Sequence, residues 1–391
     1  SMARILFTWE MGEGLGHLMP MRPVLERLVE NGHQLLVAAT DLRSARAALG
    51  HVATTIVQAP MVADRRYSLG RPAEGAADLL AVNGFLDLDS LQGRHHAWRQ
   101  LAALLKPDVL IADHSPGALL MARALSIPAI HTGTGFSLPP ERRPVLFPGF
   151  EAAPNIVRED VLLPHFNALI EQDGGTPLCM LADLYNRVEK KFLLTFEEID
   201  HLGPRTGLRY LGANVPSDGE EPEWPAAGKQ KVFAYLKPFP AIDQFLQTVN
   251  DMDLSLLMFP DRVDPAILRR HQSSNIRFVS QRQNMRALME QSALLAFNGN
   301  HGTAAAALLA GVPMLGLPLH QEHEGCCRRI IASNLGTALF RNQPKKIRPM
   351  LESLINNPEQ KRTSMEVSQR YQGFDYQDSV AYMVTATEEL L

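Results

Sequence analysis

The sequence predicts an α/β protein with two doubly wound, Rossmann-like domains. Two observations carry this prediction. Short apolar runs alternate with helical patterns in two separate series, and a stretch rich in glycine, proline and acid lies between the series. At 391 residues, the chain is also too long for one ordinary domain. We therefore expect two domains facing each other across a cleft, at the edges where the parallel strands end.

The first series opens with an apolar run at residues 4–8, which is a strand by its length and composition. A glycine-rich loop at 12–17 follows, then a helical pattern at 19–31 that stops at Gly32, and a second strand at 34–39. This strand–helix–strand unit predicts parallel strands. The same pattern returns in strands at 107–112 and 128–132 around a helix at 117–125.

The second series begins after residues 216–230, whose lack of apolar periodicity predicts a linker between domains. The expected domains are thus residues 1–215 and 231–364, with a closing segment at 365–391. In the second domain we expect strands at 231–236, 255–259, 276–279, 293–297 and 313–317, and helices at 284–290 and 303–310.

Composition excludes several classes of protein. The net charge of -4 argues against a nucleic-acid-binding surface. Three cysteines, two of them adjacent, cannot form a disulfide framework, which predicts a reducing, cytoplasmic setting. No run reaches the roughly 18 apolar residues needed to cross a bilayer, so we expect no integral membrane segment. A monomer and a homodimer remain equally compatible with the sequence.

His17 is the predicted general base. It closes the loop GEGLGH after the first strand, and a neutral imidazole at the carboxyl edge of a sheet can take a proton from an incoming hydroxyl. Asp113 ends another strand of the same sheet and would orient that imidazole. Other readings stay open: His17 caps the helix start, Asp113 caps the helix that follows it, or neighbouring His114 takes either role.

A second candidate site lies between the strand at 293–297 and the helix at 303–310. A strand, a glycine-bearing turn and a helix N-terminus together favour an anion, because free backbone N–H groups and the helix dipole point at it. The alternative is a plain turn that needs glycine for its dihedral angles. The predicted donor-binding residues here are Asn298, Gly299, Asn300, His301, Gly302 and Thr303.

Glu322 and His323 follow the strand at 313–317 and are predicted, as loop residues, to hydrogen-bond sugar hydroxyls. His320, His323 and Cys326 have the alternative spacing of a zinc site, although no fourth ligand is evident. We expect no metal site.

Apolar residues gather in the irregular stretches of the first domain and predict a hydrophobic small-molecule site, because ligand sites are mostly apolar. The alternative places most of them in the core. The predicted acceptor-binding residues are Gly14, Gly16, Phe85, Phe136, Phe147 and Met180.

Two segments resemble the GT-B-fold glycosyltransferases, particularly the bacterial natural-product members of the UDP-glycosyltransferase superfamily. Residues 16–20, GHLMP, with ERLVENGHQLLVAAT after them, are similar to that family's opening strand, loop and helix. Residues 298–336 resemble its donor-binding signature, which usually runs H-G-G-x-G-T, an acid, G-V-P, then proline and an Asp-Gln pair; GVP at 311–313 is the firmest match.

The resemblance implies an inverting, metal-independent transfer of sugar from a nucleotide-diphosphate donor to a hydroxyl or amine. His17 and Asp113 fall on the family's catalytic pair. The nucleotide sugar would be a co-substrate and no cofactor is expected. The acceptor would be a small hydrophobic molecule of secondary-metabolite type, and residues 365–391 would form a terminal helix packed on the N-terminal domain.

The donor signature departs from the family pattern at four places. Asn298 stands where the diphosphate-binding histidine is usual, and Asn300 replaces a glycine. Ala306 replaces the ribose-binding acid, and Glu322-His323 replaces the Asp-Gln pair. His301 would restore the missing charge if it turned inward. These changes leave two alternatives open: a noncatalytic protein on the same fold, and a sugar-nucleotide epimerase.

Overall fold

The structure, a computed structural model, describes residues 2–62, 67–151 and 157–391 and contains two compact α/β units. The N-terminal unit comprises Ser1–Glu197, Leu202–Gly212 and Asp375–Leu391, and the C-terminal unit comprises Glu198–His201 and Ala213–Phe374. Each unit holds one six-stranded sheet whose strands are all parallel. The predicted fold class is confirmed.

The N-terminal sheet has the order β3-β2-β1-β4-β5-β6. In this order the chain changes direction between β1 and β4, and ligands of doubly wound sheets bind at such a switch point. The strands are β1 Arg4–Trp9, β2 Gln34–Ala39, β3 Ala53–Gln58, β4 Val109–Asp113, β5 Ala129–Gly133 and β6 Lys190–Leu193.

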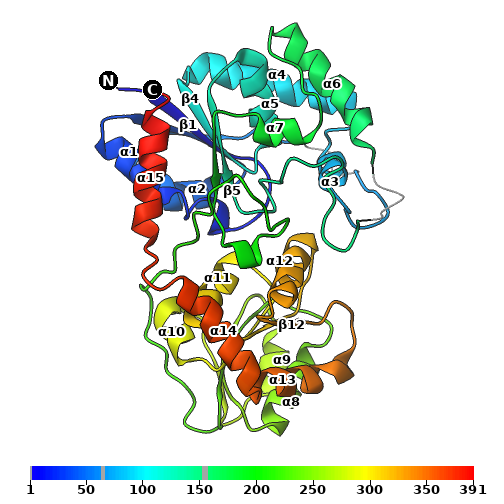
Figure 1. Cartoon of the computed structure of the whole chain (residues 1–391), viewed down its shortest axis with the longest axis vertical. Coiled ribbons are helices and arrows are strands. Elements are labelled where there is room, and N and C mark those ends of the chain that lie inside the picture. Colours follow the sequence, from blue (N-terminus) through cyan, green and yellow to red (C-terminus); the bar gives the residue numbers. More distant parts are fainter. Residues whose placement is uncertain (1, 63–66, 152–156) are drawn as a thin grey trace. The chain divides into compact units, whose positions relative to one another are not determined.

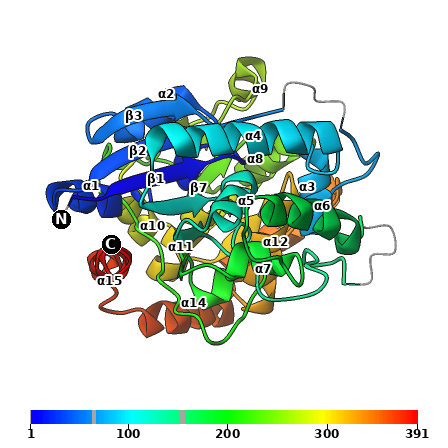
Figure 2. The same cartoon turned by 90° about the horizontal axis from the view of Figure 1, so that it is seen from above.

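Helices α4, α5 and α6 lie side by side over one face of this sheet (Figure 2). Their apolar sides and alternate residues of β1, β2 and β4 form the core there, because successive strand residues point to opposite faces. The helices of the unit are α1 Arg22–Glu30, α2 Leu42–Leu49, α3 Ala76–Val82, α4 Leu88–Leu105, α5 Pro116–Leu125, α6 Glu159–Gln172, α7 Ala182–Asn186 and α15 Tyr376–Glu388, with 3-10 turns η1 Leu15–His17 and η2 Glu197–Ile199.

The C-terminal sheet repeats the topology as β12-β11-β10-β7-β8-β9, with its switch point between β7 and β10. Its strands are β7 Lys231–Leu236, β8 Ser255–Pro260, β9 Ile276–Phe278, β10 Leu294–Phe297, β11 Met314–Gly316 and β12 Gly336–Ala338. Its helices are α8 Ile242–Asp251, α9 Pro265–Arg270, α10 Met285–Gln291, α11 His301–Ala310, α12 Gln321–Ala332, α13 Ile347–Ile355 and α14 Pro358–Arg370, with η3 Pro344–Lys346.

The end of the chain differs from the single helix expected at residues 365–391. Helix α14 packs on α11 within the C-terminal unit, and α15 packs on α1 within the N-terminal unit (Figure 1). The Tyr376 hydroxyl donates to the Pro20 carbonyl at 2.6 Å, which fixes the start of α15. The division therefore falls between Phe374 and Asp375, ten residues after the expected one, because α14 packs on α11 of the C-terminal unit.

Residues 216–230 form no helix or strand, as a linker would, yet they are bound along the C-terminal unit. Backbone hydrogen bonds join Glu220 to Arg282 and to Asn284, and the Trp224 indole N–H donates to the Gln291 side chain. The segment is therefore part of that unit.

No helix in the described part of the chain has both the length and the apolar character that crossing a membrane requires.

Candidate active site

His17 and Asp113 form a hydrogen-bonded pair at the switch point of the N-terminal sheet. His17 ends η1, just after β1, and Asp113 is the last residue of the neighbouring strand β4. The His17 Nδ1 and Asp113 Oδ1 atoms are 2.7 Å apart, and the two side chains are 13% and 4% exposed. An ionised Asp113 favours the proton on Nδ1 and leaves Nε2 with a lone pair, as a general base requires.

Two aromatic rings hold the plane of the His17 imidazole. The Trp9 ring stacks on it with centroids 5.6 Å apart and an interplanar angle of 17°. The Trp9 indole N–H donates to the Met11 carbonyl at 2.9 Å, which fixes Trp9 in turn. The His114 ring lies 5.7 Å from His17, tilted by 31°. The imidazole thus has two aromatic neighbours in addition to its hydrogen bond at Nδ1.

Burial controls the charges around this pair. Burial raises the pKa of the Asp113 carboxyl, and the adjacent His17 partly opposes that shift. Burial lowers the pKa of His114 to about 3, and the neighbouring His17 lowers it further. His114 is therefore neutral near pH 7 and is a poor base.

Glu10 holds the start of α5, the helix that follows Asp113. Its carboxyl oxygens accept from the backbone N–H groups of Gly117 at 3.1 Å and Ala118 at 3.2 Å. Burial raises the pKa of Glu10 to about 7. The helix-cap reading of Asp113 is wrong: Ser115 is the N-cap residue, and Glu10 binds the free N–H groups. No sequence spacing predicts this contact, because Glu10 lies directly after β1, more than a hundred residues before α5.

The predicted acceptor residues divide into two groups. Phe85 and Phe147 are 1% and 2% exposed and belong to the core, which favours the alternative reading for these two residues. Phe136 and Met180 are partly buried at the edge of that core. Phe136 lies 6.2 Å from the His114 ring, edge to face, and so is close to the His17 pair. Gly14 and Gly16 are exposed in the loop that carries His17.

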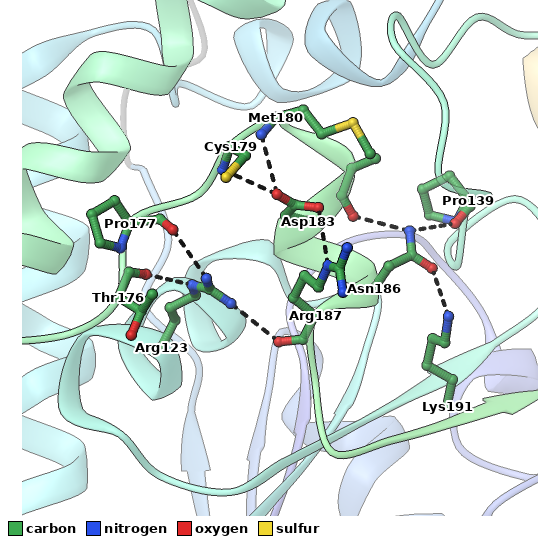
Figure 3. A network of polar contacts seen from close by, with 11 residues as sticks. Arg123, Pro139, Thr176, Pro177, Cys179, Met180, Asp183, Asn186, Arg187 and Lys191 are labelled. Atoms are coloured by element: carbon green, nitrogen blue, oxygen red, sulfur yellow. Dashed lines mark hydrogen bonds and ion pairs between the residues drawn. The ribbon is translucent and has the colours of Figure 1, made fainter.

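A polar network fixes the loop that carries Met180 (Figure 3). The Asp183 carboxylate, on α7, accepts from the Met180 backbone N–H at 3.2 Å, and from that of the preceding residue at 3.0 Å. The Asn186 amide donates to the Pro139 carbonyl at 3.0 Å, which ties α7 to the loop after β5. The Arg123 guanidinium donates to carbonyls on both sides of α7. The loop is therefore bound at a defined position.

Asn298 ties together three strands of the C-terminal sheet. Its Oδ1 accepts from the Lys237 backbone N–H at 2.8 Å, and its Nδ2 donates to the Leu317 carbonyl at 2.9 Å. The side chain is 3% exposed. Lys237 follows β7, Asn298 follows β10 and Leu317 follows β11. The Asn298 amide, which was predicted to bind the donor, thus forms hydrogen bonds within the sheet.

The predicted anion-binding turn does lead into a helix N-terminus. Gly299 has φ +105°, and a β-carbon there would lie 2.8 Å from the His323 carbonyl oxygen, so glycine is required. Asn300 is the N-cap residue of α11, and its amide donates to the Thr303 hydroxyl at 3.0 Å. Gly302 is exposed in the first turn. Free backbone N–H groups at this end of α11 remain suited to an anion.

His301 does not restore the positive charge that Asn298 lacks. Its ring stacks on His201 at 5.7 Å, and burial lowers its pKa to about 4. His301 is therefore neutral near pH 7. Ala306, where the resemblance led us to look for a ribose-binding acid, is buried within α11.

Lys237 is a cation that the sequence analysis missed. It lies at the switch point, next to Asn298, and its charge lowers the pKa of His323. No ion pair of its ammonium group is found among the described residues. The available signal was its place directly after the strand at 231–236, at the carboxyl edge of the sheet.

Glu322 and His323 lie in the first turn of α12, not in a loop as predicted. The His320 ring accepts from the His323 backbone N–H at 3.4 Å, so α12 starts earlier than the sequence suggested. Burial lowers the pKa of His323 to about 3 and raises that of Cys326 to about 12. A thiol that stays protonated is a poor zinc ligand, and the described residues contain no group of three side chains arranged to hold a metal.

Two α/β units with this strand order define the GT-B fold. No protein-family model and no curated protein sequence matches the chain. Among solved structures, the chain is similar to CalG4, the calicheamicin glycosyltransferase, with a TM-score of 0.75 and 17% identity over 100% of this chain and 98% of that one. It is also similar to the glycotransferase of kitacinnamycin, with a TM-score of 0.70 and 17% identity over 99% and 98% of the chains.

A third similar structure is the spinosyn rhamnosyltransferase SpnG, with a TM-score of 0.68 and 14% identity over 99% of each chain. SpnG has been solved with thymidine diphosphate and with the spinosyn aglycone. At these identities the likeness establishes the fold of this chain, and the assignment of chemistry depends on its own residues.

Proposed function

We propose that the protein is an inverting glycosyltransferase that moves a sugar from a nucleotide-diphosphate donor to a hydroxyl or amine of a hydrophobic small molecule. The observation that carries the proposal is the His17–Asp113 pair, with 2.7 Å between Nδ1 and Oδ1 at the switch point of a GT-B N-terminal unit. Neighbours of the same fold are natural-product glycosyltransferases, which supports the reaction class.

His17 performs the proton transfer in this reaction. Nε2 takes the proton of the acceptor hydroxyl as its oxygen attacks the anomeric carbon and the bond to the nucleoside diphosphate breaks. Asp113 keeps the other ring proton on Nδ1 and stabilises the imidazolium that forms. Because attack and departure take place on opposite faces of the sugar, the anomeric configuration inverts.

The C-terminal unit supplies the donor site. The N–H groups at the start of α11 face the developing charge on the diphosphate, and Lys237, whose charge acts on His323, adds positive potential in the same unit. We assign no divalent cation to the step, because these two sources of positive potential serve the leaving group. SpnG binds thymidine diphosphate and an aglycone, which supports a nucleotide and a small acceptor as the two ligands.

A donor screen tests the proposal. The protein is incubated with a panel of UDP- and TDP-hexoses, with and without cell extract as the acceptor source, and nucleoside diphosphate release is measured. Release that requires the extract and disappears in His17→Ala is the expected result. No release from any donor by the folded protein would refute the proposal.

The altered donor residues favour a second candidate, a noncatalytic protein on the same fold. Asn298 is held by the sheet, His301 is neutral and Ala306 is buried. Calorimetric titration with the same nucleotide sugars distinguishes the two, because the second candidate predicts binding of none. An epimerase would instead convert a nucleotide sugar in the absence of any acceptor.

A further inference from the structure

Gly12 packs directly against the reactive edge of His17. A β-carbon on Gly12 would lie 2.4 Å from His17 Nε2, 3.0 Å from Cε1 and 3.2 Å from Cδ2. The first of these distances is shorter than any van der Waals contact. Gly14, two residues on in the same loop, has nothing within 4 Å of its own β-carbon position. The tight packing is therefore particular to Gly12.

The imidazole cannot move aside without losing its other contacts. Its Nδ1 is held by Asp113 at 2.7 Å, and the ring centroids of Trp9 and His114 lie 5.6 Å and 5.7 Å from its own. A shift away from residue 12 would lengthen the Asp113 hydrogen bond or push the ring into a neighbour. A side chain at position 12 would therefore displace the imidazole from Asp113.

We propose that Gly12 is a positioning residue for His17: the missing side chain keeps the imidazole in its hydrogen bond with Asp113. The proposal rests on the proposed function, in which Nε2 takes the acceptor proton. A general base must come within about 2.6–3.2 Å of that proton's heavy atom. A misplacement of about 1 Å lowers the rate by about 10²-fold.

Gly12→Ala tests the proposal, with Gly32→Ala as the matched control. Gly12 has φ +90° and Gly32, just after α1, has φ +96°, so alanine is equally strained in both. Nothing lies within 4 Å of the β-carbon position on Gly32. We expect Gly12→Ala to lower kcat about 10²-fold with little change in the donor KM, and Gly32→Ala to keep wild-type kinetics.

Two readouts do not depend on activity. Histidine-selective ¹⁵N NMR follows the His17 Nδ1–H signal, which we expect to shift in Gly12→Ala and to stay in place in Gly32→Ala. Thermal unfolding of Gly12→Ala is compared in the wild-type and His17→Ala backgrounds. We expect Gly12→Ala to lower the Tm about 3 °C more than Gly32→Ala does, and this excess to vanish when the imidazole is absent.

These outcomes separate the proposal from the proposed function. If Gly12→Ala keeps the wild-type kcat, or if the His17 signal does not move, the positioning role is wrong. If the wild-type protein transfers no sugar, the proposed function fails, and the NMR signal and the Tm excess alone decide the packing role of Gly12. If Gly12→Ala fails to fold, recovery of folding in Gly12→Ala/His17→Ala supports the clash, and no recovery overturns it.

Discussion

Asp113→Asn is the substitution that most sharply tests how the site works. The amide has nearly the shape of the carboxylate but carries no charge and presents an NH₂ group as a donor. If that group faces His17 Nδ1, the imidazole adopts the opposite tautomer, with its proton on Nε2. Nε2 then has no lone pair to accept the acceptor proton. The substitution therefore keeps the position of the imidazole but removes its ability to act as a base.

The expected loss of rate follows from the attraction between the two charges of the pair. Asp113 Oδ1 lies 2.7 Å from His17 Nδ1 in a buried pair. Two unit charges ~4 Å apart at an effective dielectric constant of ~20 attract by about 4 kcal/mol. Losing that stabilisation of the imidazolium corresponds to roughly a 10³-fold lower rate. The same substitution in a Ser-His-Asp triad lowers kcat about 10⁴-fold, and we take this as the largest loss of rate to expect here.

Stability should change in the opposite sense. Burial places the pKa of Asp113 above its usual value, so the folded protein holds this proton more tightly than the unfolded chain. The unfolding free energy therefore falls as the pH rises from 3.8, the ordinary pKa of the carboxyl, through its raised pKa in the folded protein. At pH 7 the ionised carboxylate destabilises the fold. We expect the Tm of Asp113→Asn to equal or exceed that of the wild type.

The assay is acceptor-dependent release of nucleoside diphosphate, measured beside Tm. Asp108→Asn is the control, because Asp108 is exposed just before the same strand and its carboxylate accepts from the Arg4 backbone N–H at 2.7 Å. The control should keep wild-type kinetics. A loss in Asp113→Asn smaller than about tenfold, or a loss matched by a lower Tm, would refute the reasoning.

Three further predictions concern groups around the two sites. Burial raises the pKa of Glu10 from 4.5 to about 7, so the folded protein holds this proton more tightly than the unfolded chain does. We therefore expect the unfolding free energy of the wild type, relative to that of Glu10→Gln, to fall by about 3 kcal/mol between pH ~4 and ~8. A difference that does not change with pH in urea titrations would contradict this. Phe85→Ala should lower the unfolding free energy by about 3–5 kcal/mol, as a core ring does. Phe136→Ala should instead raise the acceptor KM and lower the unfolding free energy only slightly. If Phe85→Ala and Phe136→Ala changed the acceptor KM and the unfolding free energy equally, the assignment of Phe85 to the core and Phe136 to the acceptor site would be wrong. Lys237→Met should weaken calorimetric binding of thymidine diphosphate by about 10–100-fold, as loss of a charge-assisted hydrogen bond implies, most strongly at low salt; unchanged affinity would remove Lys237 from the donor site.

The sequence predicted the elements that are long or fully buried. The predicted strand at 231–236 matches β7, and those at 34–39 and 293–297 match β2 and β10 within a residue. Such strands read as continuous apolar runs because parallel strands are covered on both faces. Strand β3 was not predicted because it is only half-buried and forms no continuous apolar run. Strand β12 was not predicted because its three residues, one of them glycine, are too few to show a periodicity.

The candidate site was predictable where residues follow strands, and unpredictable where contacts come from elsewhere. His17 and Asp113 could be paired because parallel strands end at one edge of a sheet. The roles of Glu10 and Gly12 depend on contacts with α5 and with the His17 ring, which no spacing encodes. The sequence could not distinguish a buried Phe85 from an exposed one, because an irregular apolar stretch is compatible with either.

His17→Ala gives the most direct test of the account. Acceptor-dependent transfer from TDP- and UDP-hexoses is measured for the variant and the wild type, together with calorimetric binding of thymidine diphosphate. We predict at least a 10³-fold lower kcat, with nucleotide affinity unchanged, because His17 acts on the acceptor proton and lies outside the C-terminal unit that is proposed to bind the nucleotide. Full turnover by His17→Ala would contradict the assignment of the general base.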